Sequence, residues 1–187
     1  MNRGRALHPL LSTRFSPSCF DSAHEADGRD VGLLLDGARW SPSAGNSQPW
    51  AFIIGHRGDD VHGRLVRHLA GSSASWAPSA SLLVANLAHV HVEGTDWPFS
   101  EFSRYDLGQA VAHMSFQAQA MGLLVRQFRA FDRAAIAADF DVPAHWEVTT
   151  MSAIGRPCVG RGSTASPRSR ERREPASLLW TRSGETS

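Results

Sequence analysis

Helical and strand-like spacings of apolar residues alternate along residues 29–155, and this alternation limits the folds open to the chain. Apolar residues recur at helical spacing in residues 29–40, whereas residues 80–87 are apolar almost throughout, as in a strand covered on both faces. We expect further helices at 59–69, 104–122 and 132–140, and further strands at 50–55, 123–128 and 147–154. Helices and strands interspersed around one sheet predict a single α+β or α/β domain.

The length and composition are those of one globular domain. The chain has 187 residues, of which 42% are hydrophobic and 20% charged, and this is enough to bury a core. No strictly apolar run is longer than five residues, and the N-terminus has no apolar segment typical of a signal peptide. We therefore expect one cytoplasmic domain over residues 1–187, without a membrane span. Residues 156–187 are expected to form its extended, arginine-rich C-terminal tail.

The cysteines, basic residues and histidines exclude several kinds of site. Cys19 and Cys158 lie far apart and show no zinc-binding spacing, so we expect two reduced thiols. All 19 basic residues are arginine, which excludes a P-loop lysine, a pyridoxal Schiff base and a lysine general base. His89 and His91 alternate as on a strand, but no carboxylate or cysteine is suitably spaced. We predict no metal site.

The stretch RWSPSAGNSQPWAF at residues 39–52 is more specific than a connector between a helix and a strand requires. It resembles the Pro-Ser-x-x-Asn-x-Gln-Pro-Trp segment of the nitroreductase family of FMN enzymes. Further motifs similar to that family occur in its order: TRFSPSCFD at 13–21, RYDLGQAVAHMSFQAQAMGL at 104–123, AFD at 130–132, IGRP at 154–157 and RREPASLLW at 172–180. The resemblance implies an α+β fold with a mostly antiparallel sheet flanked by helices. It also implies an intertwined homodimer with FMN at the interface.

The resemblance implies four FMN-binding segments. An arginine fork matches a phosphate monoester bidentately, and arginines lie near both ends of the chain. The loop at 127–130 is expected to direct backbone N–H groups to N5 and O4 of the flavin, where charge arrives during reduction. The residues expected to contact FMN are Arg14, Phe15, Ser16 and Ser18, then Pro42, Ser43, Ala44 and Asn46, then Phe128, Arg129 and Ala130, and finally Arg170, Arg172 and Arg173.

Two positions depart from the family pattern. Ser18 stands where the family often has a cation near N1 and O2 of the flavin. We therefore expect a lower flavin potential, unless Arg126, Arg129 or an arginine of a partner chain supplies the charge. Arg129 itself stands where small or acidic residues are common, which changes what can enter the site.

A separate segment, TDWPFSEF at 95–102, carries aromatic residues where family members line the substrate pocket from the second subunit. Trp97, Phe99 and Phe102 are the candidates, although aromatic packing alone explains them almost as well.

The function implied is an FMN-dependent oxidoreductase that passes hydride between NAD(P)H and a small electron-poor acceptor, such as a nitroaromatic compound or a quinone. No catalytic side chain is needed, because the flavin carries the chemistry. A flavin-dependent dehydrogenase or desaturase of a small natural product, reoxidised by oxygen, is one alternative. A non-catalytic flavin- or nucleic-acid-binding protein is another. The net charge of only +1 argues against nucleic acid as a partner.

Overall fold

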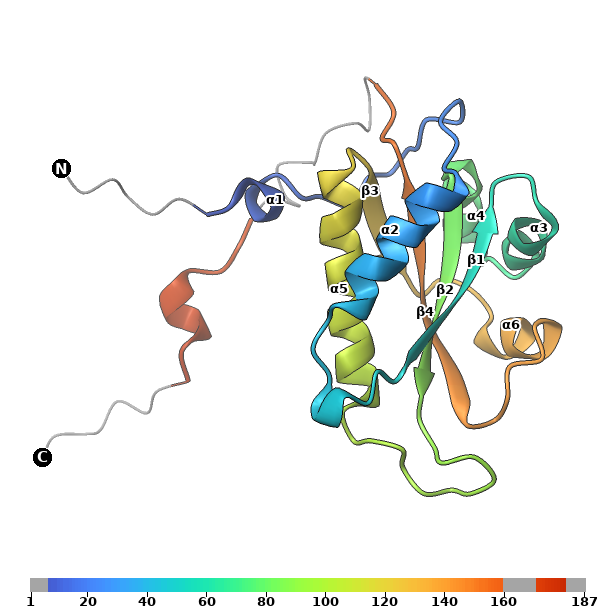
Figure 1. Cartoon of the computed structure of the whole chain (residues 1–187). Coiled ribbons are helices and arrows are strands. Elements are labelled where there is room, and N and C mark those ends of the chain that lie inside the picture. The colour runs from blue at the N-terminus through green and yellow to red at the C-terminus, as the bar shows by residue number, and fades with distance from the viewer. Residues whose placement is uncertain (1–6, 160–170, 181–187) are drawn as a thin grey trace, which may run out of the picture.

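The computed structural model describes residues 7–159 and 171–180, and its centre is a four-stranded antiparallel sheet (Figure 1). The sheet order is β1 (Trp50–His56), β2 (Leu82–His89), β4 (Trp146–Gly155) and β3 (Leu124–Phe128). The α-helices are α1 (Pro9–Ser12), α2 (Gly28–Arg39), α3 (Asp60–Arg67), α4 (Gly71–Ala74), α5 (Ser103–Ala120) and α6 (Arg133–Asp139). Every helix and strand expected between residues 29 and 155 is present, and the antiparallel pairing makes the fold α+β.

Helices cover both faces of the sheet (Figure 1). On one face, α2 and α5 pack together, and Leu34 and Met114 join a buried cluster with Val84 of the central strand β2. On the other face, α3 and α6 bury Leu65 and Ile136 in a second cluster. The edge strand β1 is only half-buried.

The two helices on the first face approach closely because α2 carries a glycine at the contact. A Cβ atom on Gly37 would lie 2.8 Å from Cβ of Gln117 in α5, closer than carbon atoms pack. The glycine therefore sets the distance between α2 and α5, and α5 in turn forms one wall of the site described below.

The N-terminal end of β4, residues 146–150, has a free edge. β3 pairs only with residues 151–155, so residues 146–150 have no neighbouring strand on that side among the described residues. On their other side these residues still pair with β2. The sheet is therefore one strand narrower at this end, beside α6 and the first turn of α5.

The expectation of two reduced thiols is wrong, because Cys19 and Cys158 form a disulfide. Their Cα atoms are 5.5 Å apart, although 139 positions separate them in sequence. The fold brings them together because the N-terminal arm (residues 13–21) runs beside the chain leaving β4, where Phe20 forms a β-bridge with Pro157. No local spacing in the sequence indicates this pairing.

The C-terminal segment 171–180 stands apart from the sheet and its covering helices in Figure 1. It contains one 3-10 turn, η3 (Pro175–Leu178), and all its residues are exposed. Residues 160–170 and 181–187 of the expected tail, including Arg170, lie outside the described residues. Within residues 7–159 and 171–180, no helix is both long enough and apolar enough to span a lipid bilayer.

Candidate functional site

A hollow beside α5 brings the N-terminal arm next to β3. We call it the arm hollow; its volume is about 270 Å³. Arg14 and Ser16 of the arm line it together with Ala112, Ser115, Phe116 and Gln119 of α5 and Leu124, Val125 and Gln127 of β3. The arm contributes a guanidinium group and a hydroxyl, and the α5 wall includes two small side chains. These groups suit an anion attached to a flat ring.

The arm is fixed at three points. Gln119 Nε2 donates to Thr13 Oγ1 at 2.6 Å, and Arg126 Nη1 donates to the carbonyl oxygen of Pro17 at 3.3 Å. The third point is the disulfide at Cys19. Because these anchors lie on both sides of Ser16, the arm hollow depends on contacts between segments far apart in sequence.

The loop after β3 has two consecutive backbone donors that are available. The N–H groups of Arg129 and Ala130 donate no hydrogen bond to any described residue. The loop is nevertheless held in place, because the carbonyl oxygen of Ala130 accepts from the N–H of Ala70 at 3.0 Å and from Ser73 Oγ. This is the loop whose N–H groups were expected to face N5 and O4 of a flavin. That contact remains a prediction.

The loop at 43–48 is held in an unusual backbone conformation. Gly45, Asn46 and Gln48 all have positive φ, which costs free energy at the two residues that are not glycine. Ser43 Oγ accepts from the N–H of Gln48 at 3.0 Å, and Asp106 Oδ2 accepts from the N–H of Ala44, also at 3.0 Å. Asp106 is 2% exposed. Sequence reasoning missed this residue, although an acid on the buried face of a predicted helix was a signal.

Within one chain, the loop at 43–48 does not reach the arm hollow. Pro42 and Asn46 instead line a separate open hollow with Trp40, which is 79% exposed. The sequence expectation was that this loop reaches the flavin of the partner subunit, and this stays a prediction.

The other residues expected to contact FMN are dispersed. Phe15 is half-buried and Ser18 is exposed, and neither lines the arm hollow. Phe128 packs edge-on against Trp76, with ring centroids 5.1 Å apart, so it belongs to the core. In the exposed segment 171–180, neither Arg172 nor Arg173 lines the arm hollow.

A cation lies beside the arm at the position next to Ser18. The Arg126 guanidinium stacks 4.1 Å from the ring centroid of Trp76 while it donates to Pro17. Because β3 fixes its backbone and Trp76 fixes its side chain, this charge is held in one place.

The three aromatic residues proposed for a substrate pocket have different surroundings. Trp97 is 77% exposed and Phe102 is 47% exposed, so both are accessible to a ligand or to a second chain. Phe99 instead stacks on His89, with ring centroids 3.8 Å apart, and His89 stacks on Trp146. Burial in this stack lowers the pKa of His89. Phe99 therefore has a clear packing role.

The chain is similar to a known protein family in sequence and to several solved structures in fold. The family model described as "Nitroreductase family" matches residues 11–87. A solved structure described as an oxidoreductase containing FMN is 27% identical, with a TM-score of 0.77, covering 84% of this chain and 80% of that one. A nitroreductase family protein from Clostridium difficile 630 is 21% identical, with a TM-score of 0.73, covering 95% of this chain and 97% of its own.

A protein from Desulfovibrio desulfuricans, assigned as a nitroreductase and solved in complex with FMN, has a TM-score of 0.75. It is 21% identical and covers 95% of this chain and 98% of its own. A search of curated protein sequences gives no match.

Proposed function

Because the nitroreductase family model matches residues 11–87, we propose that this chain is a member of that family and an FMN-dependent oxidoreductase. It would pass hydride between NAD(P)H and a small electron-poor acceptor, such as a nitroaromatic compound or a quinone. Bound FMN supplies the chemistry, which is hydride transfer at N5 of the ring. The single observation that carries the proposal is the pair of available N–H donors at Arg129 and Ala130, next to the end of β3 that lines the arm hollow.

The residues of the arm hollow fit the phosphate and ring of FMN. The Arg14 guanidinium and the Ser16 hydroxyl would hold the phosphate, which carries close to two negative charges at neutral pH. Ala112 and Ser115 leave room for a flat ring against α5. In the proposed homodimer, the second copy contributes its loop at 43–48, and the tail arginines provide a further phosphate contact.

The protein's own contribution to the reaction is to place donors in advance. The N–H groups of Arg129 and Ala130 would stabilise charge that enters the ring, and they are oriented before the reaction because Ala70 and Ser73 hold the same loop. A backbone donor imposes no requirement on the side chain. The Arg129 side chain can therefore serve another purpose without changing this role.

The serine at position 18, where the family often has a cationic side chain, gives a first testable prediction. We expect Ser18→Arg to raise the two-electron midpoint potential of the bound flavin by about 20–30 mV, because a nearby positive charge stabilises the reduced, anionic ring. Arg126→Gln should lower the potential, since Arg126 is a fixed cation bonded to Pro17, the residue before Ser18. Redox titration of both variants measures this, and identical midpoints in all three proteins would refute it.

Anaerobic mixing of the FMN-loaded protein with NADH or NADPH tests the function. We expect the absorbance at about 450 nm to bleach with one of the two donors and to return when a quinone is added. Bleaching with neither donor would contradict the proposal and favour the dehydrogenase or desaturase. A protein that retains no FMN would refute both.

A further inference from the structure

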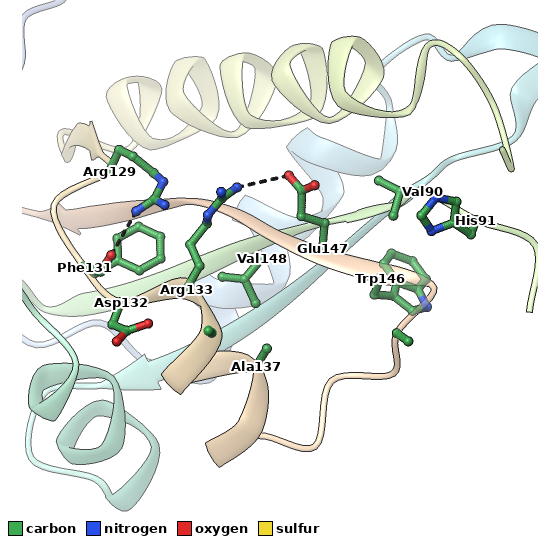
Figure 2. Close-up of a pocket in the computed structure, with 12 residues that line it drawn as sticks. Val90, His91, Arg129, Phe131, Asp132, Arg133, Ala137, Trp146, Glu147 and Val148 are labelled. Carbon is green, nitrogen blue, oxygen red and sulfur yellow. Dashed lines mark hydrogen bonds and ion pairs between the residues drawn. The ribbon is translucent and has the colours of Figure 1, made fainter. Parts of the chain in front are cut away.

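A second hollow lies along the free edge of β4 and is separate from the arm hollow (Figure 2). We call it the edge hollow; its volume is about 560 Å³. Its lining comes from the loop after β3, from α6 and from the start of β4, with Val90 and His91 at one end. The hollow exists because β3 ends opposite Met151 and leaves residues 146–150 uncovered.

Two arginine side chains line the edge hollow, and neither is fully paired. Arg129 Nη1 donates to the carbonyl oxygen of Phe131 at 2.9 Å, and its guanidinium lies 5.1 Å from the ring centroid of Phe131. Arg133 reaches Glu147 only at 3.4 Å, and its side chain is 43% exposed. Both guanidinium groups therefore keep donors for a ligand.

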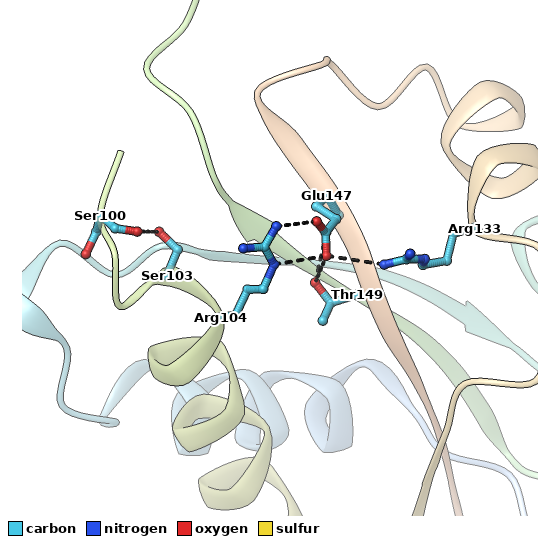
Figure 3. Close-up of polar contacts among 6 residues, drawn as sticks. All are labelled: Ser100, Ser103, Arg104, Arg133, Glu147 and Thr149. Atoms are coloured by element: carbon cyan, nitrogen blue, oxygen red, sulfur yellow. Dashed lines mark hydrogen bonds and ion pairs between the residues drawn. The ribbon is translucent and has the colours of Figure 1, made fainter. Parts of the chain in front are cut away.

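The two carboxylates at the edge hollow already have hydrogen-bond partners of their own. Glu147 accepts from Arg104 at 2.6 and 3.2 Å, one bond to each oxygen (Figure 3). The hydrogen bond with Arg104 is also the main reason that the pKa of Glu147 is lowered. Asp132 Oδ1 caps α6 by accepting from the N–H of Ala135 at 3.0 Å. With Arg104 counted, three arginines stand against these two carboxylates, which leaves one positive charge in excess.

The remaining walls of the edge hollow are flat and apolar. Trp146 and Phe131 provide aromatic surfaces, and Ala134, Ala137 and Val148 have no polar side-chain atoms. A volume of this size suits a small molecule rather than a peptide or a nucleic acid. Aromatic walls with arginine forks match a flat ring that carries a planar anionic group.

We propose that the edge hollow binds a small aromatic carboxylate, with the carboxylate on Arg129 and Arg133 and the ring against Trp146. The inference rests on the proposed function for the identification of this ligand as the electron acceptor, because Arg129 belongs to both sites. Its backbone N–H would face the flavin and its side chain lines the edge hollow. The acceptors favoured would then be electron-poor aromatic acids rather than neutral rings.

Binding of 2-naphthoate to the full-length protein tests the site without any turnover. Arg133→Gln should weaken the affinity about tenfold, because one charge-assisted hydrogen bond is lost. Arg67→Gln is the matched control: this arginine is also exposed and pairs at 3.5 Å with Asp139, but it does not line the hollow. It should leave the affinity unchanged. Neutral 2-naphthamide should bind the wild type and Arg133→Gln equally.

Glu147→Gln is expected to strengthen binding, a result that a misfolded variant would not give. Removing the carboxylate frees Arg104 and Arg133 and removes a repelling charge, so 2-naphthoate should bind severalfold more tightly. Equal affinity in the wild type and Arg133→Gln, or weaker binding in Glu147→Gln, would overturn the proposal. Displacement of 2-naphthoate by adenosine 2′,5′-bisphosphate would also overturn it, because the hollow would then serve the phosphate of NADPH.

Turnover separates failure of this inference from failure of the proposed function. In the FMN-loaded protein, kcat/KM for 4-nitrobenzoate should exceed that for 4-nitrobenzamide about tenfold, and Arg133→Gln should abolish the difference. Binding of 2-naphthoate without any reduction of either compound would refute the proposed function and leave the carboxylate site standing. Equal reduction of both compounds by the wild type would refute the acceptor class alone.

Discussion

The arm hollow and the edge hollow both adjoin the end of β3, yet they are built in different ways. The arm hollow combines residues 14–16 with residues 112–127, and a disulfide spanning 139 positions anchors the arm beside it. The edge hollow comes almost entirely from residues 129–148, along one continuous stretch of chain. A site assembled from distant segments depends on long-range ties, whereas a contiguous site depends on its local elements. The two hollows should therefore respond differently to the same perturbation.

Loss of the disulfide should produce the largest difference between ligand binding at the arm hollow and at the edge hollow. Opening a link that spans 139 positions removes up to about 4–5 kcal/mol of unfolding free energy in the chain-entropy model, and it also releases the arm that carries Arg14. We expect Cys158→Ser to weaken FMN binding while 2-naphthoate still binds at temperatures where the protein stays folded. Thermal unfolding and titration with each ligand measure this. Cys19→Ser should behave identically, and unchanged FMN affinity would show that the disulfide does not support the arm hollow.

Two arginine substitutions should act on different ligands. Arg14→Gln should lower FMN affinity about 10- to 100-fold, since charge-assisted bonds to the phosphate are lost, and should leave 2-naphthoate binding unchanged. Arg133→Gln should show the reverse pattern. Quenching of FMN fluorescence on titration with apoprotein gives the first affinity. Loss of FMN binding in both variants would mean that the two hollows act as one site.

Removal of Asp106 should destabilise the loop at 43–48. Asp106→Ala leaves the N–H of Ala44 without its buried acceptor, at a cost of about 1–3 kcal/mol. Asp106→Asn keeps an acceptor and should recover part of this. Urea unfolding and amide exchange at Ala44 follow the effect. Asp36→Ala, which breaks only an exposed ion pair with Arg39, is the control and should change stability by less than about 0.5 kcal/mol. Slow exchange at Ala44 in Asp106→Ala would contradict this role.

Among these changes, loss of the ion pair between Glu147 and Arg104 should have the smallest effect on the free energy of unfolding. Because the pKa of Glu147 is lower in the folded than in the unfolded protein, the pair stabilises the fold above about pH 4.5 and loses this effect as the pH falls through the folded value. The wild type should exceed Glu147→Gln by about 0.2–1 kcal/mol near neutral pH and by almost nothing in strong acid. Urea unfolding at about pH 7 and at successively lower values down to about pH 2 measures the difference. A difference independent of pH would assign the effect to packing instead.

The sequence predicts the elements of this fold because apolar spacing reports which face of each segment is buried. The helix at 28–39 and the strand at 82–89 follow from such local patterns. The disulfide does not, because only the complete fold brings Cys19 beside Cys158. The same limit applies to the candidate site. Arg129 departs from the family pattern in sequence, but its position beside Arg133 in one hollow depends on β3 being shorter than β4.

The central claim is that two copies of this chain hold FMN between them. Sedimentation of the purified protein, followed at 280 nm and at about 450 nm, tests this most directly because it reports assembly and flavin together. We predict one boundary at the mass of a dimer, carrying both signals with one flavin per chain. A flavin signal that travels with a monomer, or a dimer without flavin absorbance after incubation with FMN, would contradict it.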